Sequence, residues 1–145
     1  MQDFEFEEIF SVCSSLYNID NVYLEVARRH PELSPLELRE GFILVISEFM
    51  RRGWLRFVGE FHLFDLSDKG VNPMFCEDAY LDWDFDKNGA RPADDPSPEG
   101  VAALIRSKWP SEMVPAFDFG HPGFDPLWFY KWEFQWRDEQ GFLAG

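Results

Sequence analysis

The sequence predicts an α+β fold in one domain, and three observations support this. Apolar residues recur at helical spacing in three segments before residue 53. Short β-like runs with turn residues follow them. The second half adds one helical segment and runs in which aromatic and polar residues alternate. We expect three helices plus a hairpin in residues 1–70, packed with a small antiparallel sheet and one further helix in residues 71–145.

The first expected helix covers residues 3–17, and the second runs from about residue 20 to residue 30. Acidic residues crowd the first turns of the first helix, where the helix dipole favours them. Cys13 lies on the apolar side of that helix and is expected in the core. Asp20 or Asn21 can cap the second helix through a side-chain oxygen, and a proline after residue 30 ends it.

The third expected helix, residues 35–52, has the clearest start signal. Ser34 stands at the N-cap, a proline follows it, and Glu37 completes a capping box. Gly53 after a basic last turn is typical of a helix end. The outward residues are expected to be Glu37, Arg39, Glu40, Ser47, Glu48, Arg51 and Arg52.

Residues 54–58 and 61–66 are expected to form two strands, joined by a two-residue turn at Gly59-Glu60. Three helices followed by a hairpin is the element order of a winged-helix unit. That order suggests a DNA-binding regulator as an alternative function. The expected outward face of the third helix carries three acids and three bases, however, and residues 1–70 carry 13 acids and 7 bases.

The second half predicts a half-buried strand at residues 81–85, a turn at Asn88-Gly89 and a loop at residues 90–96. A helix starting at Ser97-Pro98 is expected to run to about Trp109. In residues 128–136 aromatic and mostly polar residues alternate, which predicts a strand with one aromatic face in the core. The aromatic face holds Trp128, Tyr130, Trp132, Phe134 and Trp136, and Phe129 falls on the opposite face. Phe142-Leu143 is expected to return as an edge strand.

The charge balance narrows the possible partners. The chain has 13 Lys and Arg against 27 Asp and Glu, a formal net charge of −14, and a pI near 4.4. Nucleic-acid phosphates and anionic membranes both attract basic surfaces, so neither is the expected partner. A basic protein would be attracted. The high aromatic content, 18%, indicates a folded domain rather than a disordered acidic chain.

Residues 1–10 lack the basic and apolar regions of a secretory signal, and the longest apolar run, residues 42–46, is too short to span a membrane. Cys13 and Cys76 are expected to remain thiols. We therefore expect a cytoplasmic protein. The sequence holds no metal-ligand spacing typical of zinc, no nucleophile motif and no phosphate-binding loop, so neither an enzyme nor a cofactor is expected.

A calcium loop is a second alternative. Residues 84–89 match the first six positions of such a loop, and Asp84, Asp86 and Asn88 would supply oxygen ligands. Position twelve is Asp95, where a glutamate is usual. A strand that ends at an Asn-Gly turn explains the same residues without a metal.

An acidic run between residues 77 and 95 holds seven acids and two bases beside Tyr80, Trp83 and Phe85. Such runs are often solvated faces, but Tyr, Trp and Phe are enriched at interfaces. An acidic rim beside aromatic anchors suits a basic partner.

These features together resemble the small acidic immunity proteins of bacterial toxin systems, such as those of contact-dependent growth inhibition. The resemblance is carried by Tyr80-Leu81-Asp82-Trp83-Asp84-Phe85, by Lys108-Trp109-Pro110 and by the Trp-rich segment 127–136. It implies an intracellular protein that binds a cognate toxin, often a basic nuclease, and occludes its active site or substrate groove. The candidate partner-binding residues are Tyr80, Asp82, Asp84, Asp86, Asp94 and Asp95.

Overall fold

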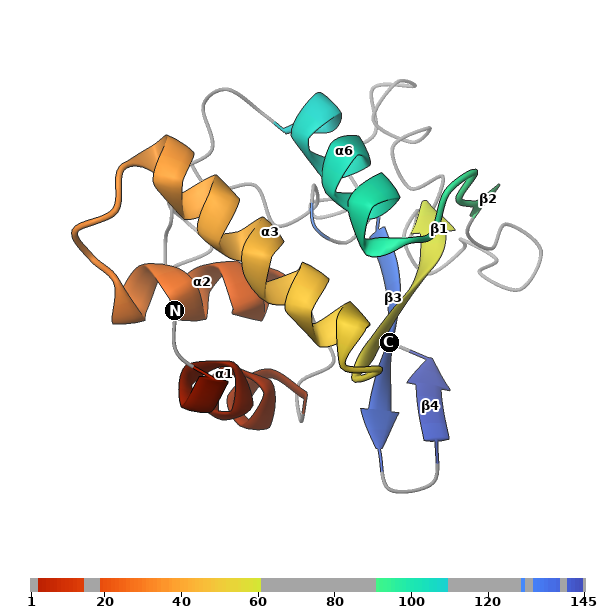
Figure 1. Ribbon diagram of the computed structural model, residues 1–145, viewed down its shortest axis with the longest axis horizontal. Coiled ribbons are helices and arrows are strands. Elements are labelled where there is room, and N and C mark those ends of the chain that lie inside the picture. The colour runs from red at the N-terminus through yellow and green to blue at the C-terminus, as the bar shows by residue number, and fades with distance from the viewer. Residues whose placement is uncertain are drawn as a thin grey trace, which may run out of the picture.

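The computed structural model describes residues 3–14, 19–60, 91–109, 129, 132–138 and 141–144. Its elements are α1 (Asp3–Ser14), α2 (Asp20–Arg29), α3 (Pro35–Arg51), β1 (Leu55–Glu60), β2 (Arg91–Pro92), α6 (Pro98–Lys108), β3 (Trp132–Asp138) and β4 (Gly141–Ala144). The strands form an antiparallel sheet in the order β2-β1-β3-β4. The predicted α+β class is confirmed, and the described residues contain three N-terminal helices and one further helix (Figure 1).

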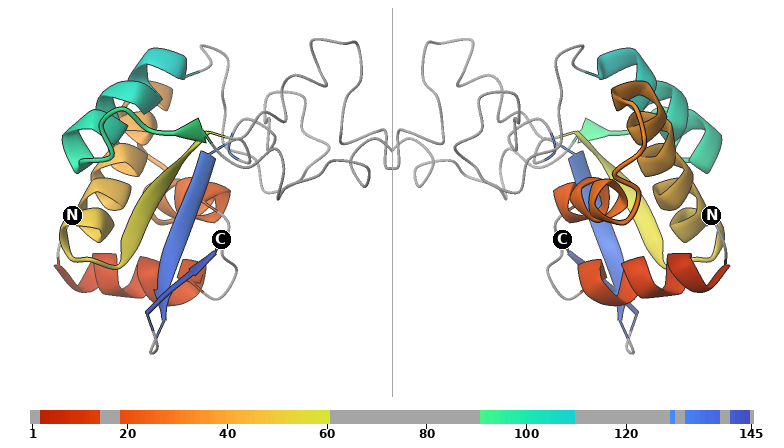
Figure 2. Two further views of the ribbon diagram at one scale, coloured as in Figure 1. Left: turned by 90° about the vertical axis from the view of Figure 1, so that its right-hand side faces the viewer. Right: turned by 90° about the vertical axis from the view of Figure 1, so that its left-hand side faces the viewer.

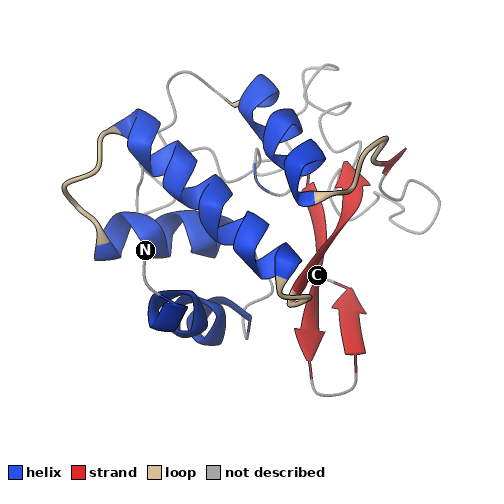
Figure 3. Cartoon of the chain, viewed as in Figure 1, coloured by secondary structure: helices blue, strands red, loops and turns tan. Residues whose placement is uncertain are grey.

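The helices α1, α2 and α3 lie to one side of the sheet (Figure 3). One cluster of buried side chains joins them to the sheet and to α6, so residues from both halves of the sequence share a core. Aromatic contacts connect the layers: Phe10 and Phe49 both lie within 6.4 Å of the ring of Trp136. Burial of such large rings contributes strongly to the stability of a core.

The start of α2 differs from the prediction. Ile19 occupies the N-cap and no side chain caps the helix, while Asp20 is the first helical residue. Asp20 is buried rather than exposed. The prediction failed because Ile19 already has helical dihedral angles, φ −68° and ψ −25°, so Asp20 lies inside the first turn rather than at the extended N-cap position from which a side chain caps.

Helix α3 begins as predicted. The Ser34 hydroxyl accepts a hydrogen bond from the Glu37 N–H, and the Glu37 carboxylate accepts one from the Ser34 N–H, at 3.2 and 3.0 Å. It ends at Arg51, and Gly53 follows with φ +74°, the left-handed conformation typical of a helix end. Ser47 was expected to point outward but is buried; α6 packs beside α3 and covers part of that face (Figure 2).

The predicted turn at Gly59-Glu60 is wrong, because both residues belong to β1 and pair with β2 and β3. The pairing of β1 with β3 shifts register between Phe57 and Gly59. Glycine marks irregular positions inside strands as well as turns, and that ambiguity misled the prediction. The predicted partner strand, residues 61–66, lies outside the described residues, as do the predicted strand 81–85 and the Asn88-Gly89 turn. Within the predicted loop, Arg91–Pro92 forms the short strand β2.

The strand β3, predicted at residues 128–136, is shorter than predicted. It starts at Trp132, and Trp132, Phe134 and Trp136 are buried, which confirms the core interpretation for these three rings. Phe129 was placed on the opposite face but is fully buried, because it precedes the strand and does not follow its alternation. The predicted return of the chain at residues 142–143 is confirmed as β4, which pairs with β3.

Helix α6 is capped as predicted: the Ser97 hydroxyl accepts a hydrogen bond from the Gly100 N–H at 3.1 Å. It ends at Lys108, and Trp109 follows as its C-cap. Two ion pairs join α6 to α3, Arg51 with Glu99 at 3.3 Å and Arg106 with Glu40 at 2.9 Å. They link the end of each helix to the first half of the other, so the two helices are antiparallel. No helix in the described ranges is long and apolar enough to cross a membrane.

Candidate functional site

Two of the predicted partner-binding residues lie in the described part of the chain. Asp94 and Asp95 are exposed in the short segment between β2 and α6. Tyr80, Asp82, Asp84 and Asp86 lie outside the described residues, and so does Asn88. The candidate site is therefore built around Asp94 and Asp95.

Asp95 is fixed by the start of α6. Its carboxylate accepts a hydrogen bond from the Ser97 N–H at 3.0 Å. Hydrogen bonds from the side chain and the backbone of Ser97 lower the pKa of Asp95 below its ordinary value. The carboxylate is thus held in one place and charged at neutral pH.

Gly100 allows this arrangement. A Cβ atom at this position would clash with the side chain and the backbone carbonyl of Asp95. The loop therefore lies directly on the first turn of α6 because residue 100 has no side chain. This close approach sets where the two carboxylates stand relative to the helix.

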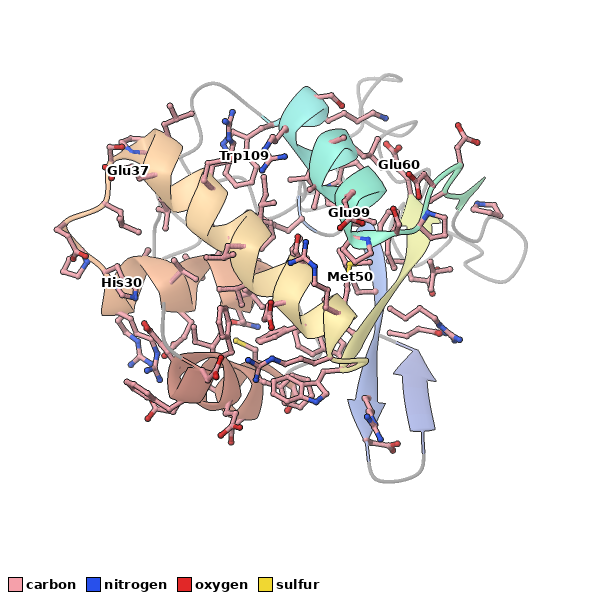
Figure 4. The ribbon with its side chains drawn as sticks, viewed as in Figure 1. His30, Glu37, Met50, Glu60, Glu99 and Trp109 are labelled. Atoms are coloured by element: carbon pink, nitrogen blue, oxygen red, sulfur yellow. The ribbon has the colours of Figure 1, made fainter. Side chains whose placement is uncertain are left out.

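The two aspartates lie on a groove of about 640 Å³ between α6, β2 and the end of β1, which we call the α6 groove. Phe57, Ala93 and Leu104 contribute apolar surface to its lining. At another part of the lining Lys108 pairs with Glu60 at 2.9 Å (Glu60 is labelled in Figure 4). Within the described ranges Asp94 makes no hydrogen bond or ion pair, so its exposed carboxylate can contact a ligand directly.

The α6 groove offers carboxylates beside apolar surface. A lysine or arginine side chain has the matching chemistry, with an apolar stem and a cationic end. The hydroxyl of Ser107, which also lines the groove, donates to the Leu104 carbonyl at 2.8 Å. The arrangement suits recognition of a cationic side chain.

A second groove was missed at the sequence level. It has a volume of about 450 Å³ and lies between the end of α2 and the first half of α3; we call it the α2–α3 groove. Its lining residues are His30, Leu33, Leu36, Glu37, Glu40, Gly41 and Leu44. Leu36 and Leu44 are 60% and 44% exposed. The sequence could have indicated this groove, because these two leucines lie eight positions apart on α3 and outside its stripe of buried apolar residues.

The arginines that suggested DNA binding are engaged with neighbouring side chains. Arg52 pairs with Glu48 at 3.0 Å, as predicted, and with Asp3 at 2.9 Å. Arg51 pairs with Glu99, and Arg56 donates to Gln135. Most of the local positive charge is therefore neutralised within the protein.

Cys13 is confirmed as a core residue and is fully buried. Burial, followed by the nearby charges of Glu25 and Asp20, raises its pKa to about 12. A thiol in this state is a poor nucleophile. His30 is the histidine that lies within the described ranges. Its ring contacts the carboxylate of Glu5, and its Nδ1 atom lies 3.4 Å from Oε1 of Glu32.

The described residues hold no cluster of three or more His, Cys, Asp or Glu side chains that could bind a metal. Of the predicted calcium ligands only Asp95 is described, and it accepts a hydrogen bond from Ser97. The calcium alternative stays a prediction because it depends on Asp84, Asp86 and Asn88.

Comparison with known proteins finds no match: no family model matches the chain, and no curated protein or solved structure is significantly similar to it.

Proposed function

We propose that the chain is a binding protein for a basic protein partner, and specifically an immunity protein that neutralises a cognate toxin. The toxin class expected from the resemblance is a basic nuclease whose active site or substrate groove is occluded. The single observation that carries the proposal is the excess of acid, a formal net charge of −14. Such a charge accelerates encounter with a basic partner.

The pairing of charges supports a protein partner over DNA. The arginines at the end of α3 pair with carboxylates of the same chain. Asp94 and Asp95, in contrast, present exposed carboxylates on a groove with apolar surface. Carboxylates of this kind can pair with the cationic groups with which a nuclease grips phosphates.

The test begins with the gene next to the one that encodes this chain. We expect it to encode a toxin, whose product co-purifies with the chain and loses its toxicity when the two are co-expressed. Absence of neutralisation by the intact chain contradicts the proposal.

Charge reversal then tests the surface. We expect Asp94→Lys to weaken toxin binding at least tenfold, since pairs of this kind contribute strongly when desolvated. Glu7→Lys on α1 is the matched control: it changes the net charge equally at an exposed position away from the groove. The same reversal at Asp82, Asp84 and Asp86 tests the remaining predicted residues. Equal effects of Asp94→Lys and Glu7→Lys would mean that only the overall charge matters.

A further inference from the structure

The α2–α3 groove exposes apolar surface. Among the described large apolar residues, four are more than 40% exposed: Phe4, Val12, Leu36 and Leu44. Two of these four line this one groove. Exposed leucines at a hollow on a helix face are typical of interaction sites rather than of solvated surface.

The hollow has a structural origin. Gly41 lies between the two leucines along α3, and a Cβ there would stand 3.2 Å from Val26 and 3.8 Å from Leu33. The glycine therefore lets α3 lie close to α2, and it lines the space of the groove together with Leu36 and Leu44. Such a space accepts an apolar side chain from outside.

Carboxylates lie beside the apolar surface of the groove. Glu37 and Glu40 line the groove, and Glu32 is exposed on the loop beside it. Figure 4 shows His30 at the end of α2 and Glu37 near the start of α3, at the same end of the molecule. Glu40 forms ion pairs with Arg39 and Arg106. The Glu37 carboxylate, in contrast, accepts a hydrogen bond from the uncharged Ser34 N–H. The rim thus retains negative charge.

We propose that the α2–α3 groove binds an apolar side chain carried on a lysine- or arginine-rich helix of a protein partner. This inference rests on the proposed function, since it takes the partner to be a basic protein, and it adds a second contact surface. A second copy of this chain is disfavoured as the occupant because two molecules of charge −14 repel each other. The undescribed segments are disfavoured too: residues 61–90 hold seven acids and two bases, and residues 110–128 hold three acids and no base.

The test uses the full chain and a labelled synthetic peptide of about 18 residues, made of leucine at helical spacing and lysine. A peptide of the same composition in scrambled order has equal charge but no apolar face. We expect the patterned peptide to bind more tightly than the scrambled one by fluorescence anisotropy. Leu36→Glu and Leu44→Glu are expected to weaken its binding about tenfold or more, since each removes a leucine contact.

The glutamate substitutions separate apolar contact from charge. Each adds negative charge, so binding driven by charge alone becomes tighter, whereas binding in the groove becomes weaker. Neither substitution is expected to disturb the fold, because both leucines are exposed on α3 and glutamate is a good helix former. Phe4→Glu is the matched control, because it makes the same kind of change at a residue that is 59% exposed outside the groove lining. It is expected to leave binding unweakened.

Three results overturn the inference: no preference for the patterned peptide, equal or tighter binding by the leucine variants, or a dimer in sedimentation velocity that Leu44→Glu abolishes. Failure of the proposed function looks different. In that case no toxin is neutralised, yet the patterned peptide still binds the groove. In the converse case, the Leu36→Glu and Leu44→Glu variants neutralise the toxin at full strength while the two peptides bind equally. That result excludes the groove as a binding site and leaves the proposed function intact.

Discussion

Asp20 is the buried carboxyl group with the clearest consequence for stability. It is 3% exposed, and its Oδ1 atom has no hydrogen-bond partner in the described structure. Burial raises its pKa from 3.8 to about 6, although hydrogen bonds from the backbone at Asp20 and Asn21 act in the opposite direction. Because the folded protein holds the proton more tightly, the contribution of Asp20 to stability is complete below about pH 4. It is lost as the pH rises to about 6.

We predict that Asp20→Asn removes this loss. The variant gains stability relative to the wild type as the pH rises from 4 to 6.5, by at most about 3 kcal/mol. Urea unfolding at several pH values measures the difference in free energy of unfolding between the variant and the wild type. Carboxylates such as Glu25 and Asp95, whose lowered pKa values change stability in the opposite direction, are present in both proteins and cancel in this difference. A difference that is constant across this pH range contradicts the assignment.

Glu25 is a buried carboxylate that is ion-paired. It accepts hydrogen bonds from Arg28 at 2.6 Å and from Arg29 at 2.9 Å. Burial alone would raise its pKa, but the two arginines outweigh burial and lower it. We predict that Glu25→Ala lowers the free energy of unfolding by about 1–3 kcal/mol. The loss is smaller than for a buried charge left with no partner, because Arg29 keeps its ion pair with Glu8. Glu99→Ala, which breaks an exposed pair with Arg51, should cost under about 0.5 kcal/mol in the same denaturation experiment.

At the scale of the element, the capping box of α3 is a testable source of stability. We predict that Ser34→Ala lowers the free energy of unfolding by about 1 kcal/mol, since the Glu37 N–H loses its acceptor. Ser34→Asn, which keeps a side-chain acceptor, should recover most of the loss. Equal losses in both variants would show that the hydroxyl does not act as a cap.

Replacing Gly100 on α6 by alanine is predicted to change stability in the direction opposite to that usual for a glycine in a helix. Replacing glycine by alanine inside a helix stabilises it by up to about 1 kcal/mol. Here we predict that Gly100→Ala destabilises the protein, because the new Cβ would clash with the backbone of Asp95. Thermal unfolding measures the sign, and an increase in melting temperature would falsify this account of the loop.

The elements with local chemical signals were predictable. Ser34 and Ser97 begin α3 and α6 as the sequence indicates, since a cap depends on neighbouring residues alone. Gly59 and Phe129 were misplaced because their roles depend on distant partners. Gly59 pairs with Pro92 and Glu133 in other strands, and Phe129 packs with rings of α2, α3 and Trp109.

At the scale of the whole molecule, the candidate sites could be predicted only in part. The exposure of Asp94 and Asp95 follows from their acidic, proline-rich surroundings. The α6 groove does not, because it forms where β1, β2 and α6 meet from distant parts of the chain. Likewise, Leu36 and Leu44 line a groove only because α2 lies beside α3, an approach that Gly41 permits.

The net charge opposes folding of the whole molecule, and salt should reveal this. At pH 7.5 the charge is near −14, so repulsion among carboxylates destabilises the compact state. Raising NaCl from about 20 to about 300 mM shortens the Debye length severalfold. We predict that the melting temperature then rises by about 2–5 °C.

The same titration at pH 4.5 provides the control. Near the pI of 4.4 the net charge is close to zero, so salt can only weaken ion pairs such as Arg29 with Glu8 and Arg106 with Glu40. The melting temperature should therefore stay constant or fall. A fall at pH 7.5 as well would mean that these pairs outweigh the repulsion. In that case the surface would have little unbalanced negative charge with which to attract a basic partner.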